Sequence, residues 1–311
     1  MKFATITLNP SIDRYYDARD GFYSGELNRF DAATEYPGGK GINVSRMLKK
    51  LGQDSSCYIL SGGTNGEKLK KLLKDEDIEP VCISTRCETR INTKITDGEG
   101  SQTEINENGG PVSKDEFQGL LRLLDLSDCD VYFLSGSNPK GLSPTACKTV
   151  VELLRLKQKK VICDLSGEAL KEAVEARPFL IKPNRQEFEG LLGREIEDRD
   201  VVRSASEFFR GTGIEILLTL GKDGSVYSGE AGTFFVSSPE VRNARGFSGA
   251  GDTFLSSFSL IREKTGDVEK ALDFGCAAAF AKVQCDGTAL PELSDIKNAL
   301  SKITLKKINL L

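Results

Sequence analysis

The sequence predicts an α/β fold: a doubly wound, mostly parallel sheet with helices on both faces and a small β-sheet lid. Between residues 130 and 220, short apolar segments of strand length alternate with longer segments of helical period. Repeated strand, helix and strand units build a parallel sheet that helices cover on both faces. Near the N-terminus, short segments with a period of two lie apart from this alternation, and they predict the lid.

The chain is long enough for one extended domain. Its 311 residues, of which 39% are hydrophobic, can bury a large core. No long linker, internal repeat or low-complexity tract divides it. We therefore expect a single domain over residues 1–311, with the lid formed by about 11–36 and 87–108.

The first half of the chain supplies one part of the sheet and the lid. Strands are expected over 2–8, 55–60, 89–96 and 102–106, and helices over 44–51, 66–76 and 113–125. The two lid strands are expected to pair across a turn at Asp97-Gly98. Residues 14–36 are polar and aromatic without a helical period, so we expect them to complete the lid.

The second half continues the alternation to the end of the sheet. Strands are expected over 130–134, 161–164, 179–182 and 215–220, with a hairpin near 226 and 234–236. Helices are expected over 144–157, from 167, from 184, from 250 and over 271–283. The last of these is rich in alanine, and its Gly275 is small enough to pack closely against a flat ligand.

Composition excludes several classes of function. The chain has 42 basic and 46 acidic residues and a formal charge of −4, which gives no bulk attraction to nucleic acid or to an anionic membrane surface. No apolar run approaches the ~20 residues of a membrane span, and the N-terminus is typical of a strand rather than a signal peptide. We expect a cytoplasmic protein.

Cysteine and histidine usage limits the chemistry. The eight cysteines show no Cys-x-x-Cys spacing and mostly lie in apolar runs, so reduced core thiols are favoured over disulfides or a metal site. Histidine is absent, which excludes Ser-His-Asp and Cys-His catalysis and histidine-ligated zinc. Any general base must therefore be a carboxylate, lysine, tyrosine or thiol.

A glycine-rich turn, Gly249-Ala250-Gly251-Asp252, opens a helix near the C-terminus. The backbone N–H groups at such a turn lack carbonyl partners and converge at the positive end of the helix dipole. This turn is therefore predicted to bind an anion, with the carboxylate of Asp252 beside it. Asp252 is the candidate general base, and the alternative is that it only caps the helix.

A second glycine-rich turn, Pro37-Gly38-Gly39-Lys40-Gly41, opens the helix near residue 44. Its glycines would let a ligand lie on the backbone, and Lys40 and Asn43 could hold that ligand. The alternative is a plain loop. Asp13 follows the first strand, where α/β sheets place ligand contacts, although an aspartate after Pro-Ser is also a turn former.

Two further candidates have plain structural alternatives. Asn184 and Glu187 follow the strand at 179–182, but their spacing also fits a helix capping box. Arg90 lies on a predicted lid strand, where it could reach a phosphate, although a surface arginine is the simpler interpretation.

These motifs together resemble the PfkB branch of the ribokinase-like carbohydrate kinases. The matching segments are Pro37 to Val44, Lys182-Pro183-Asn184 with Glu187, Thr219-Leu220-Gly221 with Gly224, and Gly249 to Asp252. They follow the order and spacing of the family over essentially the whole chain. The resemblance implies a ribokinase-like kinase that transfers the γ-phosphoryl group of ATP to a sugar hydroxyl.

The resemblance also implies a role for each matching residue. Asp252 would be the general base, and the turn of Ser248, Gly249, Ala250 and Gly251 the anion hole. Asn184 and Glu187 would organise Mg²⁺, while Lys182, Asn184, Thr219, Gly221, Gly224, Ser248 and Gly251 belong to the nucleotide side. Asp13, Gly38, Gly39, Lys40 and Asn43 would hold the sugar, with Arg90 and Ser137 on its phosphate.

Within the branch, Thr5 to Asp13, Thr89 to Asn92 and Asp164 to Leu170 look most like the bacterial 1-phosphofructokinases. That likeness implies fructose 1-phosphate as the substrate, with tagatose 6-phosphate as the alternative. Glu26 stands where the minor 6-phosphofructokinases have a lid lysine, and Ser248 replaces the family's usual aliphatic residue. A homodimer through the lid and an inactive sugar-phosphate or nucleotide-binding regulator stay open.

Overall fold

The computed structural model describes residues 1–18, 21–23, 25–97, 102–241 and 248–309. The predicted turn after Asp97 and the two residues before Ser248 therefore lie outside the described residues. Within the described ranges, no helix is long and apolar enough to cross a membrane.

The main sheet has ten strands in the order β14-β13-β12-β11-β10-β9-β8-β1-β4-β5. The strands are β1 (Phe3–Thr7), β4 (Ser55–Ser61), β5 (Pro80–Ser84), β8 (Val131–Ser135), β9 (Lys160–Asp164), β10 (Leu180–Ile181), β11 (Glu215–Thr219), β12 (Ser225–Gly229), β13 (Gly232–Ser237) and β14 (Thr304–Ile308). The run from β5 to β11 is parallel, and β12, β13 and β14 are antiparallel. The predicted doubly wound, mostly parallel sheet is confirmed.

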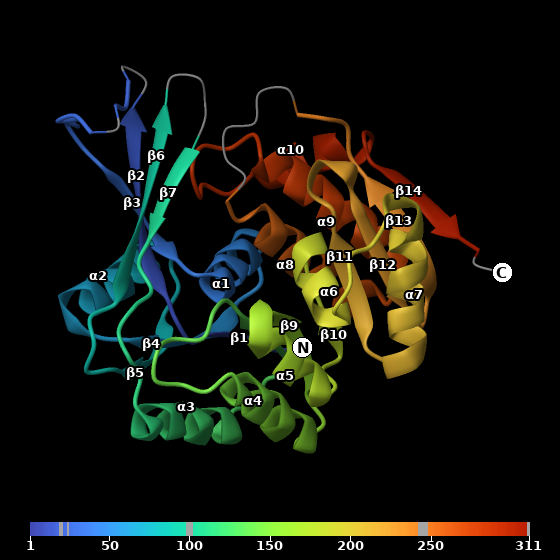
Figure 1. The fold of residues 1–311 in the computed structure, drawn as a ribbon, viewed down its shortest axis with the longest axis horizontal. Helices are drawn as coiled ribbons and strands as arrows, with labels where there is room; N and C mark the ends of the chain where they lie inside the picture. The colour runs from blue at the N-terminus through green and yellow to red at the C-terminus, as the bar shows by residue number, and fades with distance from the viewer. Residues whose placement is uncertain (19–20, 24, 98–101, 242–247, 310–311) are drawn as a thin grey trace.

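Helices cover both faces of this sheet (Figure 1). One face is covered by α1 (Lys40–Lys50), α2 (Gly63–Asp75), α8 (Ala250–Thr265) and α9 (Val268–Lys282), with α10 (Leu293–Leu300) packed on α9. The other is covered by α3 (Lys114–Leu126), α4 (Thr145–Leu156), α5 (Gly167–Glu175), α6 (Arg185–Leu192) and α7 (Val201–Thr212). Successive residues of β4 alternate between the two cores, as a strand buried on both faces requires.

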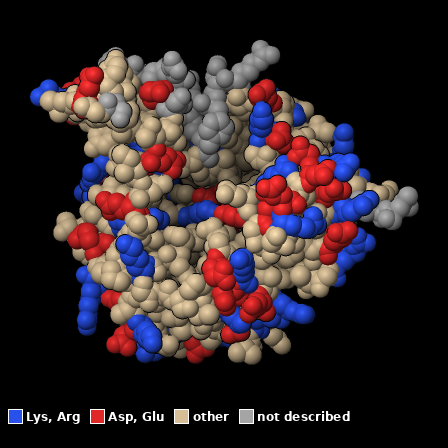
Figure 2. Space-filling view, viewed as in Figure 1, with Lys and Arg blue, Asp and Glu red and all other residues tan. Residues whose placement is uncertain are grey.

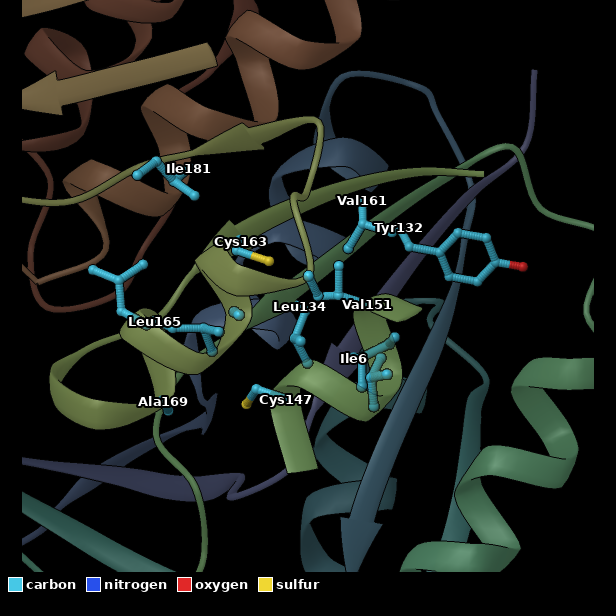
Figure 3. Close-up of a cluster of buried hydrophobic side chains, with 14 of the residues drawn as sticks. Ile6, Tyr132, Leu134, Cys147, Val151, Val161, Cys163, Leu165, Ala169 and Ile181 are labelled. Atoms are coloured by element: carbon cyan, nitrogen blue, oxygen red, sulfur yellow. The ribbon is translucent and has the colours of Figure 1, made fainter. Parts of the chain in front are cut away.

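The core that faces α3 to α7 holds two cysteines. Figure 3 shows Cys147 of α4 and Cys163 of β9 among Leu134, Val151 and Leu165. All eight cysteines are free. Burial raises the pKa of the Cys147 thiol to about 12, which keeps it unreactive at neutral pH. The predicted reduced core thiols are confirmed at these two positions.

The lid is a separate four-stranded sheet in the order β3-β2-β6-β7. It consists of β2 (Ser11–Ala18), β3 (Thr34–Gly38), β6 (Arg90–Asp97) and β7 (Gln102–Asn106) and stands above the main sheet in Figure 1. The β2 and β6 strands are parallel, and the two outer pairs are antiparallel. The predicted lid segments thus supply the four strands, and β3 extends two residues beyond the predicted bound at 36.

Four elements were not predicted. These are β5, α7, α10 and β14. The structure also gives Gly275 another role than ligand contact, because a Cβ there would lie 2.5 Å from the ring of Phe254. Gly275 lets α9 approach α8 closely, so the expectation that it faces a flat ligand was wrong.

We predict that Gly275→Ala lowers the free energy of unfolding by about 1–3 kcal/mol, because the added methyl group overpacks the contact between α8 and α9. Gly211→Ala is the matched control, since Gly211 lies in α7 with nothing within 4 Å of its Cβ position. That change should stabilise the protein by roughly 0.5–1 kcal/mol. Urea unfolding of both variants tests the prediction, and equal effects would contradict it.

Candidate active site

A cavity of about 380 Å³ lies between the lid and the carboxyl ends of the parallel strands. Its volume suits a small-molecule ligand. Figure 2 shows a hollow near the middle of this face with basic and acidic side chains at its floor. Because β1, β8, β9 and β10 are parallel, their carboxyl ends meet at one edge, where such sheets bind ligands.

The lid presents one polar face to this cavity. In the register of the lid, Asp13 pairs with Asn92 and Tyr15 with Lys94. Side chains two residues apart share a face, so these groups point the same way. The Asp13 carboxylate accepts hydrogen bonds from Asn92 Nδ2 at 3.2 Å and Ser11 Oγ at 2.8 Å, and lies 3.4 Å from Lys94 Nζ. The predicted sugar ligand Asp13 is therefore fixed at the end of the lid.

The floor of the cavity holds a buried carboxylate between two lysines. Asp164 ends β9, and its oxygens lie 2.7 Å from Lys40 Nζ and 3.0 Å from Lys182 Nζ. Burial alone would raise the pKa of Asp164, but Lys182 and Lys40 lower it below its ordinary value. The pKa of Lys40 is raised, because Asp164, Asp252 and Glu187 outweigh its burial. Asp164 is therefore an anion that holds both lysines in place.

Asp252 lies in the first turn of α8, at the same floor. Its carboxylate accepts a hydrogen bond from Asn43 Nδ2 at 2.8 Å, so two residues that were predicted separately, as sugar ligand and as base, meet in the structure. Burial and the nearby charge of Asp164 raise the pKa of Asp252 to about 6. The two carboxyl groups thus have pKa values displaced in opposite directions, which is a common arrangement in acid–base sites.

The glycine turn begins α8 next to Asp252. Gly249 has φ of 82°, a left-handed conformation that favours glycine, and it forms no side-chain cap. Gly251 leaves room for Lys182, whose Nζ would lie 3.2 Å from a Cβ there. Gly249 and Gly251 line the cavity, and Ala250 begins the helix between them. The free N–H groups of this turn can receive an anion at the positive end of α8.

Ser248 precedes this turn and ties it to the lid. Lys94 Nζ of β6 donates to Ser248 Oγ at 2.5 Å and to Tyr15 Oη at 3.0 Å. Lys94 is 4% exposed. A buried cation on the lid is therefore bonded to the residue that leads into the anion-binding turn.

The glycines of the turn before α1 are required mainly by packing. A Cβ on Gly38 would lie 2.3 Å from Asp13 Oδ1, and one on Gly41 would lie 2.4 Å from Thr7 Oγ1. Gly39, with φ of 118°, lines the cavity together with Lys40 and Asn43. Gly38 makes room for Asp13 and does not line the cavity, so the structure brings only part of the predicted turn to the ligand.

Asn184 and Glu187 form the capping box that was the alternative for this pair. Asn184 Oδ1 accepts from Glu187 N at 2.8 Å, and Glu187 Oε2 accepts from Asn184 N at 2.8 Å. The cap leaves Glu187 Oε1 available, 4.0 Å from Lys40 Nζ. The carboxylate therefore reaches the edge of the site as well as capping α6.

The residues predicted for the nucleotide side lie at the end of β11. Thr219 N donates to Pro183 O at 3.0 Å, which places this strand end beside Asn184. Gly221 has φ of 64° and Gly224 has φ of 104°, and the two glycines flank a short turn. Neither glycine nor Thr219 lines the cavity described above, so their nucleotide contacts stay a prediction.

Arg90 and Ser137 also line the cavity. Arg90 Nη1 donates to Glu107 O at 2.9 Å and Nη2 to Asn9 O at 3.0 Å, while Nε has no partner among the described residues. Burial lowers the pKa of Arg90 from its ordinary value. Asn9 also donates to Ser137 Oγ at 3.2 Å. The two residues predicted to bind the sugar's phosphate are therefore brought together through Asn9.

Sequence reasoning did not assign roles to Asp164, Lys94 and Asn92. Asp164 is the last residue of a buried strand, and Asp13 comes shortly after another strand. The argument from strand ends that selected Asp13 therefore applies to Asp164 as well. Asn92 lies two residues and Lys94 four residues after Arg90, so all three share one face of the strand. The period of two would therefore have placed Asn92 and Lys94 beside Arg90. Their partners on β2 come from 79 to 81 residues away in sequence, which no local pattern shows.

Comparisons with known proteins show the family of the chain. A family model described as pfkB family carbohydrate kinase matches residues 6–295. A 1-phosphofructokinase of Bacillus subtilis (strain 168) is 33% identical over 89% of this chain and 91% of its own length. A 1-phosphofructokinase of Borreliella burgdorferi is 30% identical over 98% of each chain. A solved structure from Thermotoga maritima, described as a possible 1-phosphofructokinase, has a TM-score of 0.91 at 26% identity and covers 99% of this chain and 100% of its own.

We predict that Asp164→Asn shifts the pKa of Asp252 downward from about 6. The negative charge of Asp164, which raises this pKa, is lost, and Lys40 can then move toward Asp252. The free energy of unfolding should fall by about 3 kcal/mol, since two lysines lose their carboxylate. Carbon NMR titration of the Asp252 carboxyl group measures the shift. Asp128→Asn, which breaks the exposed pair with Lys2, is the control. A pKa that stays at 6 would refute the electrostatic account.

Proposed function

Because the chain belongs to the pfkB family of carbohydrate kinases, we propose that it transfers the γ-phosphoryl group of ATP to fructose 1-phosphate, which gives fructose 1,6-bisphosphate. The chain is a phosphotransferase with an alcohol group as acceptor, as its family and relatives establish. The alternative of an inactive regulator is therefore set aside. A homodimer through the lid and a cytoplasmic location stay predictions.

One observation supports the proposed chemistry most directly. Asp252 is a buried carboxylate with a pKa near 6, placed in the first turn of a helix whose N-terminus can bind an anion. A general base is most effective when its pKa lies near the working pH. Phosphoryl transfer needs a positioned acceptor hydroxyl, a base beside it and neutralised phosphate charge, and it needs no histidine.

In the proposed reaction, Asp252 accepts the proton of the acceptor hydroxyl as that oxygen attacks the γ-phosphorus of ATP. A new oxygen–phosphorus bond forms, the bond to the bridging oxygen breaks, and ADP leaves. Asn43 orients the Asp252 carboxylate, and the N–H groups from Ser248 to Gly251 receive negative charge on the transferred group. Lys40 and Lys182 lie at the same floor and add positive charge there.

Mg²⁺ fits this site as an ion that keeps much of its water. Among the described residues, no group of three or more His, Cys, Asp and Glu side chains could hold a metal ion. Glu187 still offers the oxygen that its cap does not use, and oxygen is the ligand that Mg²⁺ prefers. Asn184 and Glu187 would then hold the ion through water beside the nucleotide phosphates. When bound, Mg²⁺ neutralises charge on those phosphates.

The substrate proposal depends on which cations remain for a sugar phosphate. Lys40 is paired with Asp164, and Lys94 is bonded within the lid. Arg90 retains an N–H group without a partner among the described residues, and it lines the cavity together with Ser137. We propose that Arg90 and Ser137 bind the phosphate of the substrate. Asp13, Gly39 and Asn43 would bind hydroxyl groups of the sugar. Lys40 would contact the substrate from the floor of the cavity. Tagatose 6-phosphate is the alternative substrate.

A coupled ADP-release assay tests the proposed substrate. Fructose 1-phosphate, tagatose 6-phosphate and fructose 6-phosphate are compared by kcat/KM at fixed ATP and Mg²⁺. The proposal expects the highest value for fructose 1-phosphate. A higher value for either of the other two sugars would replace the proposed substrate while leaving the kinase class intact.

We predict that Asp252→Asn lowers kcat by about 10² to 10⁴, because it removes the base and keeps the volume of the side chain. In the wild type, kcat/KM should fall as the pH drops through about 6, where Asp252 gains a proton and can no longer accept one. Steady-state rates from pH 5 to 8 test both statements, with ATP binding as the control for folding. A variant with a tenth of wild-type kcat would remove Asp252 from this role.

We predict that Arg90→Ala lowers kcat/KM for the sugar phosphate by the equivalent of about 2–4 kcal/mol, because a planar guanidinium can grip two phosphate oxygens. Arg90→Lys should restore only part of the loss. The KM for ATP should change little, because Arg90 lies at the lid end of the cavity. Arg86→Ala, a nearby arginine that does not line the cavity, is the control. A raised KM for ATP alone would contradict the assignment.

A further inference from the structure

Helix α9 ends in a lysine that the described mechanism does not use. Lys282 is 0% exposed, and its Nζ donates to the carbonyl oxygen of Gly287 at 2.8 Å. Within the described part of the chain, no ion pair joins it to a carboxylate. An ammonium group has three N–H donors, so among the described residues this one bond leaves most of its capacity unused. A buried cation with so little compensation calls for an explanation.

Lys282 lies directly behind the glycine turn of α8. Its Cε would be 3.7 Å from a Cβ on Gly249, the residue that begins the turn. Asn43 Nδ2, which holds Asp252, lies 3.8 Å from the same point. The side chain of Lys282 therefore reaches the back of the turn whose N–H groups open toward the cavity.

The charged groups around Lys282 do not neutralise it. Asp252 of α8 and the thiol of Cys285 favour its charged form, while Arg46 of α1 and Lys94 of the lid oppose it. Burial is the largest influence, and together these groups lower the pKa of Lys282 to about 8. At neutral pH the side chain is therefore a cation, held in a place that disfavours its charge.

Such a cation reduces the stability of the folded protein. A lysine whose pKa is lowered on folding binds fewer protons in the folded state between pH 8 and its ordinary value of 10.5. Its burial therefore costs stability at pH 7, and that cost disappears as the pH rises through this window. A neutral side chain of similar length would avoid the cost, so packing alone does not account for a lysine here.

We propose that Lys282 is a positioning residue that places a fixed positive charge behind the glycine turn, where it stabilises the phosphoryl group during transfer. This proposal rests on the proposed kinase function. The charge adds to the positive end of α8, and the bond to Gly287 O fixes its position before the reaction. The partner that Lys282 lacks among the described residues is then the anion held at the turn.

Lys282→Met tests this role, because methionine keeps the length of the side chain and removes its charge. We expect kcat to fall between tenfold and a hundredfold with little change in the KM of the sugar, and the Tm at pH 7 to be equal or higher. In the wild type, kcat/KM should also fall as the pH rises through about 8, and the variant should lack this alkaline limb. Lys264→Met, which removes an exposed charge near the end of α8, is the control.

A binding measurement separates this proposal from the choice of substrate. At pH 8.5, an anion at the turn should raise the pKa of Lys282, so ATP binding should take up protons in the wild type. Calorimetry in buffers of different ionisation enthalpy measures that uptake without any sugar present, and Lys282→Met should lack it. Wild-type kcat in Lys282→Met, or equal proton uptake in both proteins, would overturn the proposal whatever sugar the enzyme uses.

Discussion

The site depends on one buried carboxylate that holds two lysines. Asp164 forms ion pairs with Lys40, the first residue of α1, and with Lys182, the residue after β10. Without that anion, two ammonium groups would share the floor of the cavity and repel each other. The same negative charge raises the pKa of Asp252. Asp164 thus positions the two lysines whose charge is proposed to attract phosphate, and it raises the pKa of Asp252, the proposed base.

The parallel sheet determines where these charges can meet. The carboxyl ends of β1, β8, β9 and β10 form one edge, and helices α1 and α8 begin at that edge with glycine-rich turns. The lid closes the remaining side, and along β2 and β6 the polar residues Asp13, Asn92 and Lys94 alternate with the apolar residues Ile12, Ile91 and Ile95. The polar side chains face the cavity, and the apolar side chains of β2 and β6 lie on the other side of the lid sheet.

The sequence was sufficient for the fold class and for residues close to glycine turns. Asp252, Asn43 and Lys40 follow turns whose composition alone indicates an anion or ligand site, and the structure brings all three to one floor. Lys94 was missed because its importance comes from contacts with Tyr15 and Ser248, which are distant in sequence. The role of Gly38 was misjudged for the same reason, since its neighbour Asp13 comes from another strand. Local pattern shows which residues can do chemistry, and tertiary register decides which of them meet.

The short connections of the lid have a mechanical consequence. Only residues 8–10 separate β1 from β2, and only Gly39 separates β3 from α1. Asn9 in the first joint receives the guanidinium of Arg90, and Gly39 in the second lines the cavity. These two connections are thus parts of the proposed ligand site, so a rotation of the lid about them would also move groups that are proposed to bind the ligand. A substitution that stiffens either joint would alter catalysis and lid movement together.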